Sequence, residues 1–223
     1  IHFNFMARGE PLANENFIKN NALIFARLKQ LFINYSKHFR FNVSTILPLN
    51  FLGLANLHYP YKGGAPELYD VFKRAFVHGL APTFYYSAYS TNKHFRREWL
   101  PNSVSLSHGL KLLKIWQDKT YLIPKIHFAF IEGENDSVDS VRDLCYEIVK
   151  SGLKTNVNIV RYNPYSEKYG KESGEEIIYR NAFMLEHLLN CKVKIIPKVG
   201  FDAQNVKQHK YFWKVCLVEV LRS

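Results

Sequence analysis

The chain has 223 residues, of which 47% are hydrophobic and 15% aromatic, enough for the core of one large α/β domain. Its 30 Lys and Arg outnumber 19 Asp and Glu, and the net charge of +11 favours a polyanionic partner, nucleic acid first. No apolar run approaches the roughly 20 residues of a membrane span. No signal peptide pattern is present, so we expect a cytoplasmic protein without a membrane partner.

Short strand-like runs alternate with helical patterns along the whole chain. In chain order we expect a strand at 1–6, a helix at 15–37, a strand at 41–45, a loop at 50–65, a helix at 66–78, a strand at 83–89, a helix at 104–116, a strand at 123–130, a helix at 137–151, a strand at 157–162, a helix at 172–189 and a strand at 191–196. The loop is assigned on Gly53, Pro60, Gly63 and Gly64. Residues 200–223 are basic and aromatic and have no clear assignment.

This order is a βα unit repeated about five times and followed by a strand. Sequential βα units joined by right-handed crossovers form a parallel sheet, either open or closed like a barrel. In such folds the chemistry collects at the carboxyl ends of the strands. The fold class is therefore α/β, and the residues after each strand are the candidates for a site.

Hydrogen-bonding groups, some of them beside Gly or Pro, follow all six expected strands. They are Arg8, Gly9, Glu10 and Pro11; Ser44 and Thr45; Ser87, Tyr89 and Asn92; Glu132, Glu134, Asn135 and Asp136; Asn163 and Pro164; Lys198 and Asp202. No Ser/His/Asp set, glycine-rich phosphate loop or HExxH motif accompanies them, so no catalytic residue is assigned. The groups suit a ligand that carries an amine, a carboxylate and a ribose.

Five segments in order resemble the radical S-adenosylmethionine (SAM) enzymes, specifically the ribosomal RNA adenine methyltransferases of the RlmN and Cfr type. The segments are FMARGEPLAN (5–14), FNVSTILP (41–48), YYSAYSTNKHFRREWLP (85–101), IHFAFIEGENDS (126–137) and VNIVRYNPYS (157–166). The resemblance implies a partial (β/α)6 barrel over residues 1–204, with extra residues at 50–80 and a basic aromatic extension at 205–223.

The resemblance also implies roles for individual residues in binding SAM. Gly9 and Glu10 would hold the amino group, and Ser44 and Ser87 the carboxylate or ribose. Asn163 would contact the adenosine. Tyr89 stands where the family has a cofactor-contacting His. Each motif also has a local interpretation: a Gly-Glu-Pro turn between strand and helix, serines that cap helices, and an Asn-Pro turn.

The family's [4Fe–4S] cluster is bound by a CxxxCxxC loop that lies one βα unit before the Gly-Glu-Pro turn. This sequence lacks that loop and the first strand and helix of the barrel, and its first residue is Ile rather than Met. Cys145, Cys191 and Cys216 are widely spaced, without zinc or CxxC spacing, and are expected to be core thiols in a reducing compartment. We therefore expect no metal ligand in this chain. The cluster ligands are expected upstream of it or on another chain, or they have been lost.

A second departure concerns the family's methyl-accepting cysteine. Asn205 stands near its place, and an amide is not a sulfur nucleophile. Three functions therefore remain open. The first is a SAM-dependent enzyme that modifies RNA and needs an electron donor. The others are a basic scaffold that binds RNA or protein without catalysis, and a radical SAM enzyme acting on a small molecule or peptide.

Basic residues cluster in two places, where we expect contacts with RNA, either rRNA or tRNA. They are Lys93, Arg96 and Arg97 after the third strand, and Lys207, Lys210 and Lys214 among the aromatic residues of the C-terminal region. Cations mixed with aromatic rings suit RNA, through phosphate contacts and base stacking. The alternative is a solvated helix face with aromatic anchors in the core.

Overall fold

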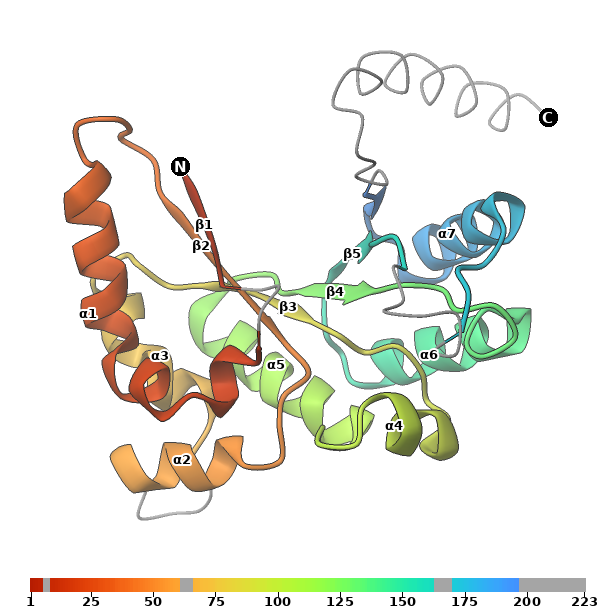
Figure 1. Cartoon of the computed structure of the whole chain (residues 1–223), viewed down its shortest axis with the longest axis horizontal. Helices are drawn as coiled ribbons and strands as arrows, with labels where there is room; N and C mark the ends of the chain where they lie inside the picture. Colours follow the sequence, from red (N-terminus) through yellow and green to blue (C-terminus); the bar gives the residue numbers. More distant parts are fainter. Residues whose placement is uncertain (6–8, 61–65, 163–169, 197–223) are drawn as a thin grey trace.

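The structure is a computed structural model, and it describes residues 1–5, 9–60, 66–162 and 170–196. Six parallel strands form one sheet in chain order (Figure 1). They are β1 (His2–Phe5), β2 (Arg40–Thr45), β3 (Thr83–Tyr86), β4 (Lys125–Phe128), β5 (Asn156–Ile159) and β6 (Val193–Ile195). The α/β class and all six expected strands are confirmed, and the open sheet is consistent with a partial barrel.

The helices lie along one side of this sheet (Figure 1). They are the 3-10 helix η1 (Pro11–Ala13), α1 (Glu15–Phe32), α2 (Phe51–His58), α3 (Leu68–Val77), α4 (Lys93–Trp99), α5 (Leu106–Thr120), α6 (Val138–Lys150) and α7 (Glu175–Leu189). On the described ranges no helix is both long and apolar enough to cross a membrane.

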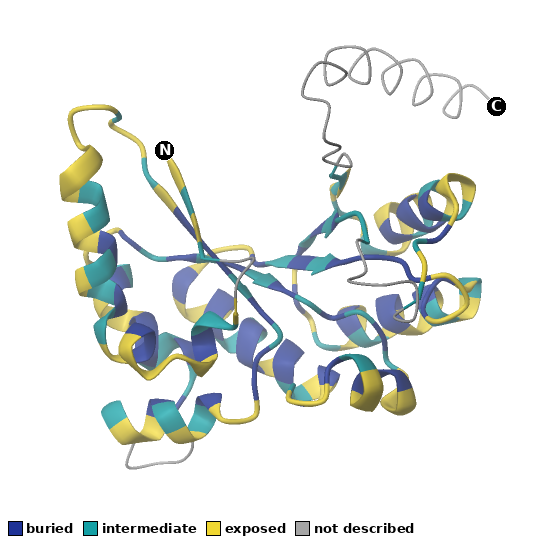
Figure 2. Cartoon of the chain, viewed as in Figure 1, coloured by how far each residue is buried: buried dark blue, intermediate teal, exposed yellow. Residues whose placement is uncertain are grey.

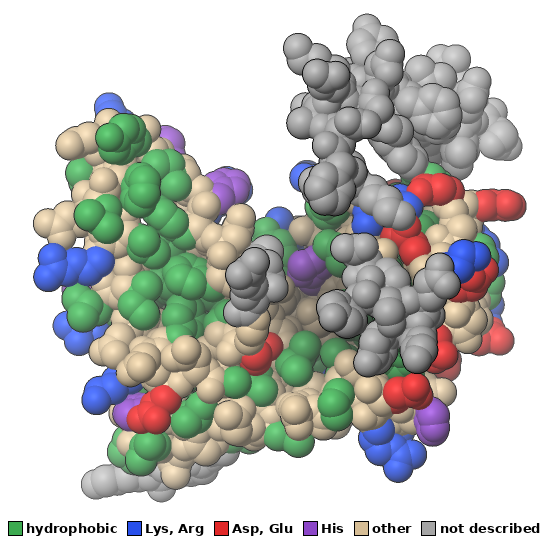
Figure 3. All heavy atoms as spheres, in the orientation of Figure 1, with side chains coloured by type: hydrophobic (Ala, Val, Ile, Leu, Met, Phe, Trp, Pro, Cys, Tyr) green, Lys and Arg blue, Asp and Glu red, His purple; other side chains and the backbone are tan. Residues whose placement is uncertain are grey.

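The two faces of the sheet differ in polarity, because successive side chains of a strand point to opposite faces. On the helix-covered face the core is built from Phe41, Val43, Phe84, Tyr86, Ile126, Phe128, Val157 and Ile159, all buried (Figure 2). On the other face the same strands carry Asn4, Asn42, Ser44, Thr83, Tyr85, Lys125, His127, Asn156, Asn158 and Lys194. Parallel sheets are usually apolar on both faces. The second, inner face of this sheet is instead polar, and the surface is hollowed between α1 and α7 (Figure 3).

The expectation of a loop at 50–65 is wrong for its first half, because α2 spans Phe51–His58. Phe51 and Ala55 are four residues apart on one face of this helix and both are buried. Burial of that face outweighs the weak helix propensity of Gly53. α4 was not predicted either; it begins after Asn92, whose side chain accepts hydrogen bonds from the next helical N–H groups.

We expect Gly53→Ala to raise the free energy of unfolding by about 0.5–1 kcal/mol, since an alanine loses less backbone entropy in a helix. A Cβ at this position would meet no atom within 4 Å. Gly133, which also has open space but a φ of +75°, is the matched control. There the same change should destabilise by about 1 kcal/mol. Chemical denaturation measures both; a loss of stability at position 53 would contradict the explanation.

Candidate functional site at the strand ends

Glu10 lies directly after the first strand and connects it to the second. Gly9 before it has a φ of +100°, and Pro11 after it opens η1, so the turn has the backbone expected for this motif. One carboxylate oxygen, Oε1, accepts hydrogen bonds from the Leu12 N–H at 3.0 Å and the Thr45 hydroxyl at 2.7 Å. The other, Oε2, accepts from the Ile46 N–H at 2.8 Å. Glu10 is thereby fixed against the carboxyl end of β2.

Counting donors from the described residues, Glu10 can accept one more hydrogen bond. A carboxylate oxygen takes about two donors, so Oε1 is filled and Oε2 has one position left by these residues. Burial raises the pKa of this carboxyl, although the hydrogen bonds from Thr45, Ile46 and Leu12 oppose the shift. A ligand ammonium at Oε2 would favour the charged form. The geometry therefore suits a cationic donor.

Ser44, the second predicted residue, lies on the polar inner face of β2 and is half-buried. Its hydroxyl is 3.2 Å from Nδ1 of His127 on β4. Burial lowers the pKa of His127, and the nearby charge of Lys125 lowers it further. The neutral imidazole can accept a hydrogen bond from the Ser44 hydroxyl at Nδ1 and keep Nε2–H as a donor. This places His127, which was not predicted from the sequence, beside the predicted serine.

The lowered pKa of His127 predicts a pH dependence of stability. The unfolded chain binds a proton at this residue near the ordinary value of about 6.5, before the folded protein does. Stability should therefore fall as the pH decreases from about 6.5 toward the lowered pKa. His127→Gln leaves the other titratable groups in place, so its unfolding free energy should depend less on pH. Urea denaturation at several pH values compares the two; parallel curves would contradict the assignment.

Ser87 and Tyr89 follow β3 at the same end of the sheet. The Ser87 N–H donates to the Thr45 carbonyl at 2.9 Å, which ties the residue to the end of β2. Tyr89 adopts a left-handed φ of 55°, unusual for a residue with a side chain, and its ring stacks on Phe95 with centroids 6.4 Å apart. Burial raises the pKa of the Tyr89 hydroxyl. Gly9, Glu10, Ser44, Ser87 and Tyr89 thus all lie at or near the carboxyl ends of β1–β3.

The side chains after β4 have a structural role. Asn135 accepts from the Ile131 N–H at 2.8 Å and donates to the carbonyls of Ala129 and Tyr89. The Asp136 carboxylate accepts from the Gly133 N–H and the Ser173 hydroxyl. These buried groups hold the loop beside Tyr89. Asn163, Pro164, Lys198 and Asp202, along with Arg8, lie outside the described residues.

Of the three basic residues expected to contact RNA after β3, Lys93 and Arg97 are exposed on α4. Arg96 is only 8% exposed. Its guanidinium donates to the carbonyls of Ala88 at 2.6 Å and Val104 at 2.9 Å, among other contacts. An arginine fixed in this way is not free for RNA, so the expectation is wrong for Arg96. Lys207, Lys210 and Lys214 lie outside the part of the chain that the structure describes.

The described cysteines do not fit an iron–sulfur cluster. Cys145 and Cys191 are free thiols, and burial raises the pKa of each to about 11, so both stay protonated near neutral pH. A [4Fe–4S] cluster is held by three or four cysteine thiolates, and the described residues contain two cysteines. Within the described ranges, no group of three His, Cys, Asp or Glu could hold a metal ion.

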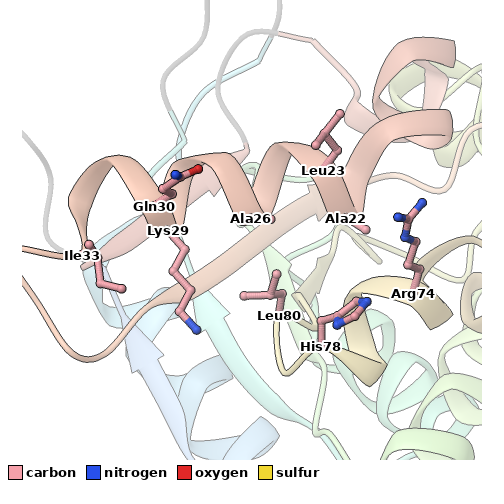
Figure 4. Close-up of a pocket in the computed structure, with 9 residues that line it drawn as sticks. All are labelled: Ala22, Leu23, Ala26, Lys29, Gln30, Ile33, Arg74, His78 and Leu80. Carbon is pink, nitrogen blue, oxygen red and sulfur yellow. The ribbon is translucent and has the colours of Figure 1, made fainter.

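A groove of about 410 Å³ lies away from this site, between α1 and α3 (Figure 4). Its lining includes Leu23, Ala26, Ile33 and Leu80, with Lys29, Arg74 and His78 among them. None of the predicted site residues lines it, so it belongs to the outer surface of the helical layer.

Comparison with known proteins gives relatives of one kind, although no family model matches the chain. It is 28% identical over 196 residues to a probable dual-specificity RNA methyltransferase RlmN of Thermotoga neapolitana, a match that covers 85% of this chain and 49% of the relative. A protein of the same name from Lachnospira eligens is 26% identical over 109 residues, or 48% of this chain and 31% of the relative. The chain therefore spans about half the length of the Thermotoga relative and a smaller part of the Lachnospira relative.

Two solved structures have a similar fold. A domain of a pyruvate-formate lyase-activating enzyme from Bacteroides vulgatus has a TM-score of 0.59 at 13% identity, covering 87% of this chain and 98% of that one. A radical SAM methyltransferase from Sphaerobacter thermophilus has a TM-score of 0.53 at 16% identity, covering 83% and 50%. The chain is thus similar in sequence to RNA methyltransferases named RlmN, and similar in fold to a pyruvate-formate lyase-activating enzyme domain and a radical SAM methyltransferase.

Proposed function

We propose that this chain is the SAM-binding core of a radical SAM enzyme that modifies RNA. Its relatives in support of this are named as RNA methyltransferases. The observation that carries the proposal is the acceptor position on Glu10 that the described residues leave open, at the rim of a polar sheet face. Oε2 of Glu10 and the Gly9 carbonyl would bind the SAM ammonium. Ser87 would hydrogen-bond to its carboxylate or ribose, and the Ser44 oxygen could accept a hydrogen bond from the ribose. Asn163 would contact the adenosine, and Tyr89 would contact the cofactor.

RNA is the proposed substrate, with the chain's charge of +11 in support. Lys93 and Arg97 would contact phosphates from the exposed side of α4, and the C-terminal lysines Lys207, Lys210 and Lys214 would extend the contact. Replacing the latter three with Glu should weaken RNA binding and flatten its salt dependence. The partial barrel would comprise residues 1–204, and residues 205–223 would form a separate basic extension.

The [4Fe–4S] cluster, whose role is to supply the electron that cleaves SAM, would be held by ligands other than the described cysteines. A soluble electron donor would serve the cluster in the cytoplasm. In this division of labour, the residues of this chain bind and orient SAM and the RNA. In the sequence, Asn205 stands near the place of the family's methyl-accepting cysteine, and an amide cannot accept a methyl group as a thiolate does. The proposal therefore includes both methyl transfer and a different radical SAM reaction on RNA.

A basic scaffold that binds RNA without catalysis is the second candidate, since the net charge of +11 supports RNA binding with or without a reaction. The test uses the full-length product of the natural gene, reconstituted anaerobically with iron and sulfide. If a cluster forms, we expect an absorption band at about 400 nm from thiolate–iron charge transfer. Incubation with SAM, dithionite and bulk RNA should then give methylated adenine. A colourless protein that binds RNA would support the scaffold; a coloured protein inactive on RNA would indicate a different substrate.

A further inference from the structure

The inner face of the sheet carries a cation without an acidic partner. Lys125 is the first residue of β4, and its ammonium donates to the Tyr85 hydroxyl at 3.0 Å. The ammonium also lies 4.8 Å from the centre of the Tyr85 ring. No ion pair joins Lys125 to a carboxylate among the described residues, whereas Lys114 pairs with Asp118 on the outer surface.

On the described part of this sheet face, the neighbours of Lys125 are polar and include no carboxylate. The register pairs Ser44 with Tyr85, Tyr85 with Lys125, and Lys125 with Asn156 across three neighbouring strand pairs. His127 lies two residues further on the same face, and burial together with Lys125 lowers its pKa, so the ring is neutral near pH 7. None of the described residues on this face of the six strands is Asp or Glu. A half-buried ammonium in such a place lacks the counter-charge that usually accompanies it.

We propose that Lys125 and Tyr85, with His127 beside them, form an oxyanion-binding subsite on the inner face of the sheet. The ammonium has three donors, and the described residues take one of them at Tyr85, which leaves two for a ligand. The Tyr85 oxygen accepts from Lys125, which leaves its own O–H as a donor, and neutral His127 offers Nε2–H. Several donors directed at one place are what a carboxylate or a phosphate oxygen requires.

The subsite rests on the proposed function. It adds Lys125, which lies outside the five segments that resemble the family. Two ligands carry the matching group: the carboxylate of SAM, and a phosphate of RNA that enters the hollow. Ser44, assigned to SAM, is paired in register with Tyr85, and Tyr85 with Lys125, so the subsite lies in the same row of the same face as Ser44.

The test compares Lys125→Met and Lys125→Arg with the natural full-length, reconstituted protein. Met keeps an unbranched side chain against the Tyr85 ring and removes the charge, and Arg keeps the charge. Lys111→Met is the matched control, because Lys111 is an exposed lysine on α5. Thermal melting confirms that each variant is folded. Affinities are measured for SAM, for decarboxylated SAM and for a short RNA over a range of salt concentrations.

If the subsite holds the SAM carboxylate, Lys125→Met binds SAM roughly 10-fold more weakly and decarboxylated SAM unchanged. If it holds a phosphate, SAM affinity is unchanged, RNA affinity falls, and the salt slope decreases by about 1. Lys125→Arg should restore part of either loss. Equal affinities of Lys125→Met and Lys111→Met for all three ligands, in folded protein, would overturn the subsite. Failure of the natural protein itself to bind SAM would instead overturn the proposed function.

Discussion

Glu10→Gln should weaken SAM binding by roughly 10- to 100-fold, the value of one hydrogen bond between charged groups. The substitution removes the charge that attracts the SAM ammonium at Oε2. It also brings an NH₂ group against the backbone N–H of Ile46 or against the donors Leu12 and Thr45. A donor that faces a donor costs about 1–3 kcal/mol of stability when buried. Calorimetric titration of full-length protein with SAM measures the affinity.

Thr45→Val separates the binding effect from the stability effect. It removes the hydroxyl that donates to Oε1 and also the acceptor of the Leu47 N–H, but it leaves the Glu10 charge in place. We expect a loss of stability comparable with that of Glu10→Gln and a much smaller loss of SAM affinity. If the two variants lost affinity equally, Glu10 would be a structural residue and not a cofactor ligand.

Arg96→Met should lower the free energy of unfolding by about 2–4 kcal/mol, because it leaves buried carbonyl groups without a donor. The guanidinium joins Ala88, in the segment after β3, to Ser103 and Val104 before α5. The segment it holds also contains Ser87 and Tyr89. Denaturation in urea measures the change, and SAM affinity should fall as this segment loosens.

Arg97→Met is the control for Arg96→Met, since the neighbouring side chain on α4 is exposed. It should change stability by less than about 0.5 kcal/mol. If Arg97 contacts a phosphate, the variant should also bind RNA more weakly and with a smaller salt slope. The reverse pattern, with Arg97→Met unstable and Arg96→Met stable, would contradict the structural roles of both residues.

The fold was largely predictable because its strands alternate strictly. In β3, β4 and β5 every second residue is buried, and the sequence carries apolar side chains at those positions. Helices α6 and α1 begin after Ser137 and Asn14, whose side chains cap them. α2 and α4 were missed, since each is a short helix with two buried residues. Such tertiary contacts are not visible in local propensity.

The candidate site was predictable only in part. The residues that follow a strand can be read along the sequence, as with Glu10 and Ser87. A contact between strands depends on register, so the approach of His127 to Ser44 could not be predicted. A signal existed nonetheless: Lys125 and His127 are polar residues at alternate positions between large apolar ones. Arg96 and Arg97 are chemically identical neighbours, and only the folded chain separates the buried one from the exposed one.

The central claim is that SAM binds at the carboxyl ends of the strands with its ammonium on Glu10. A crystal structure of the full-length, cluster-reconstituted protein with SAM tests it most directly. We predict the SAM nitrogen within about 3 Å of Oε2 of Glu10, with Ser44 or Ser87 donating to the ligand. SAM bound elsewhere, or bound at this rim with Glu10 still contacting only Leu12, Thr45 and Ile46, would contradict it.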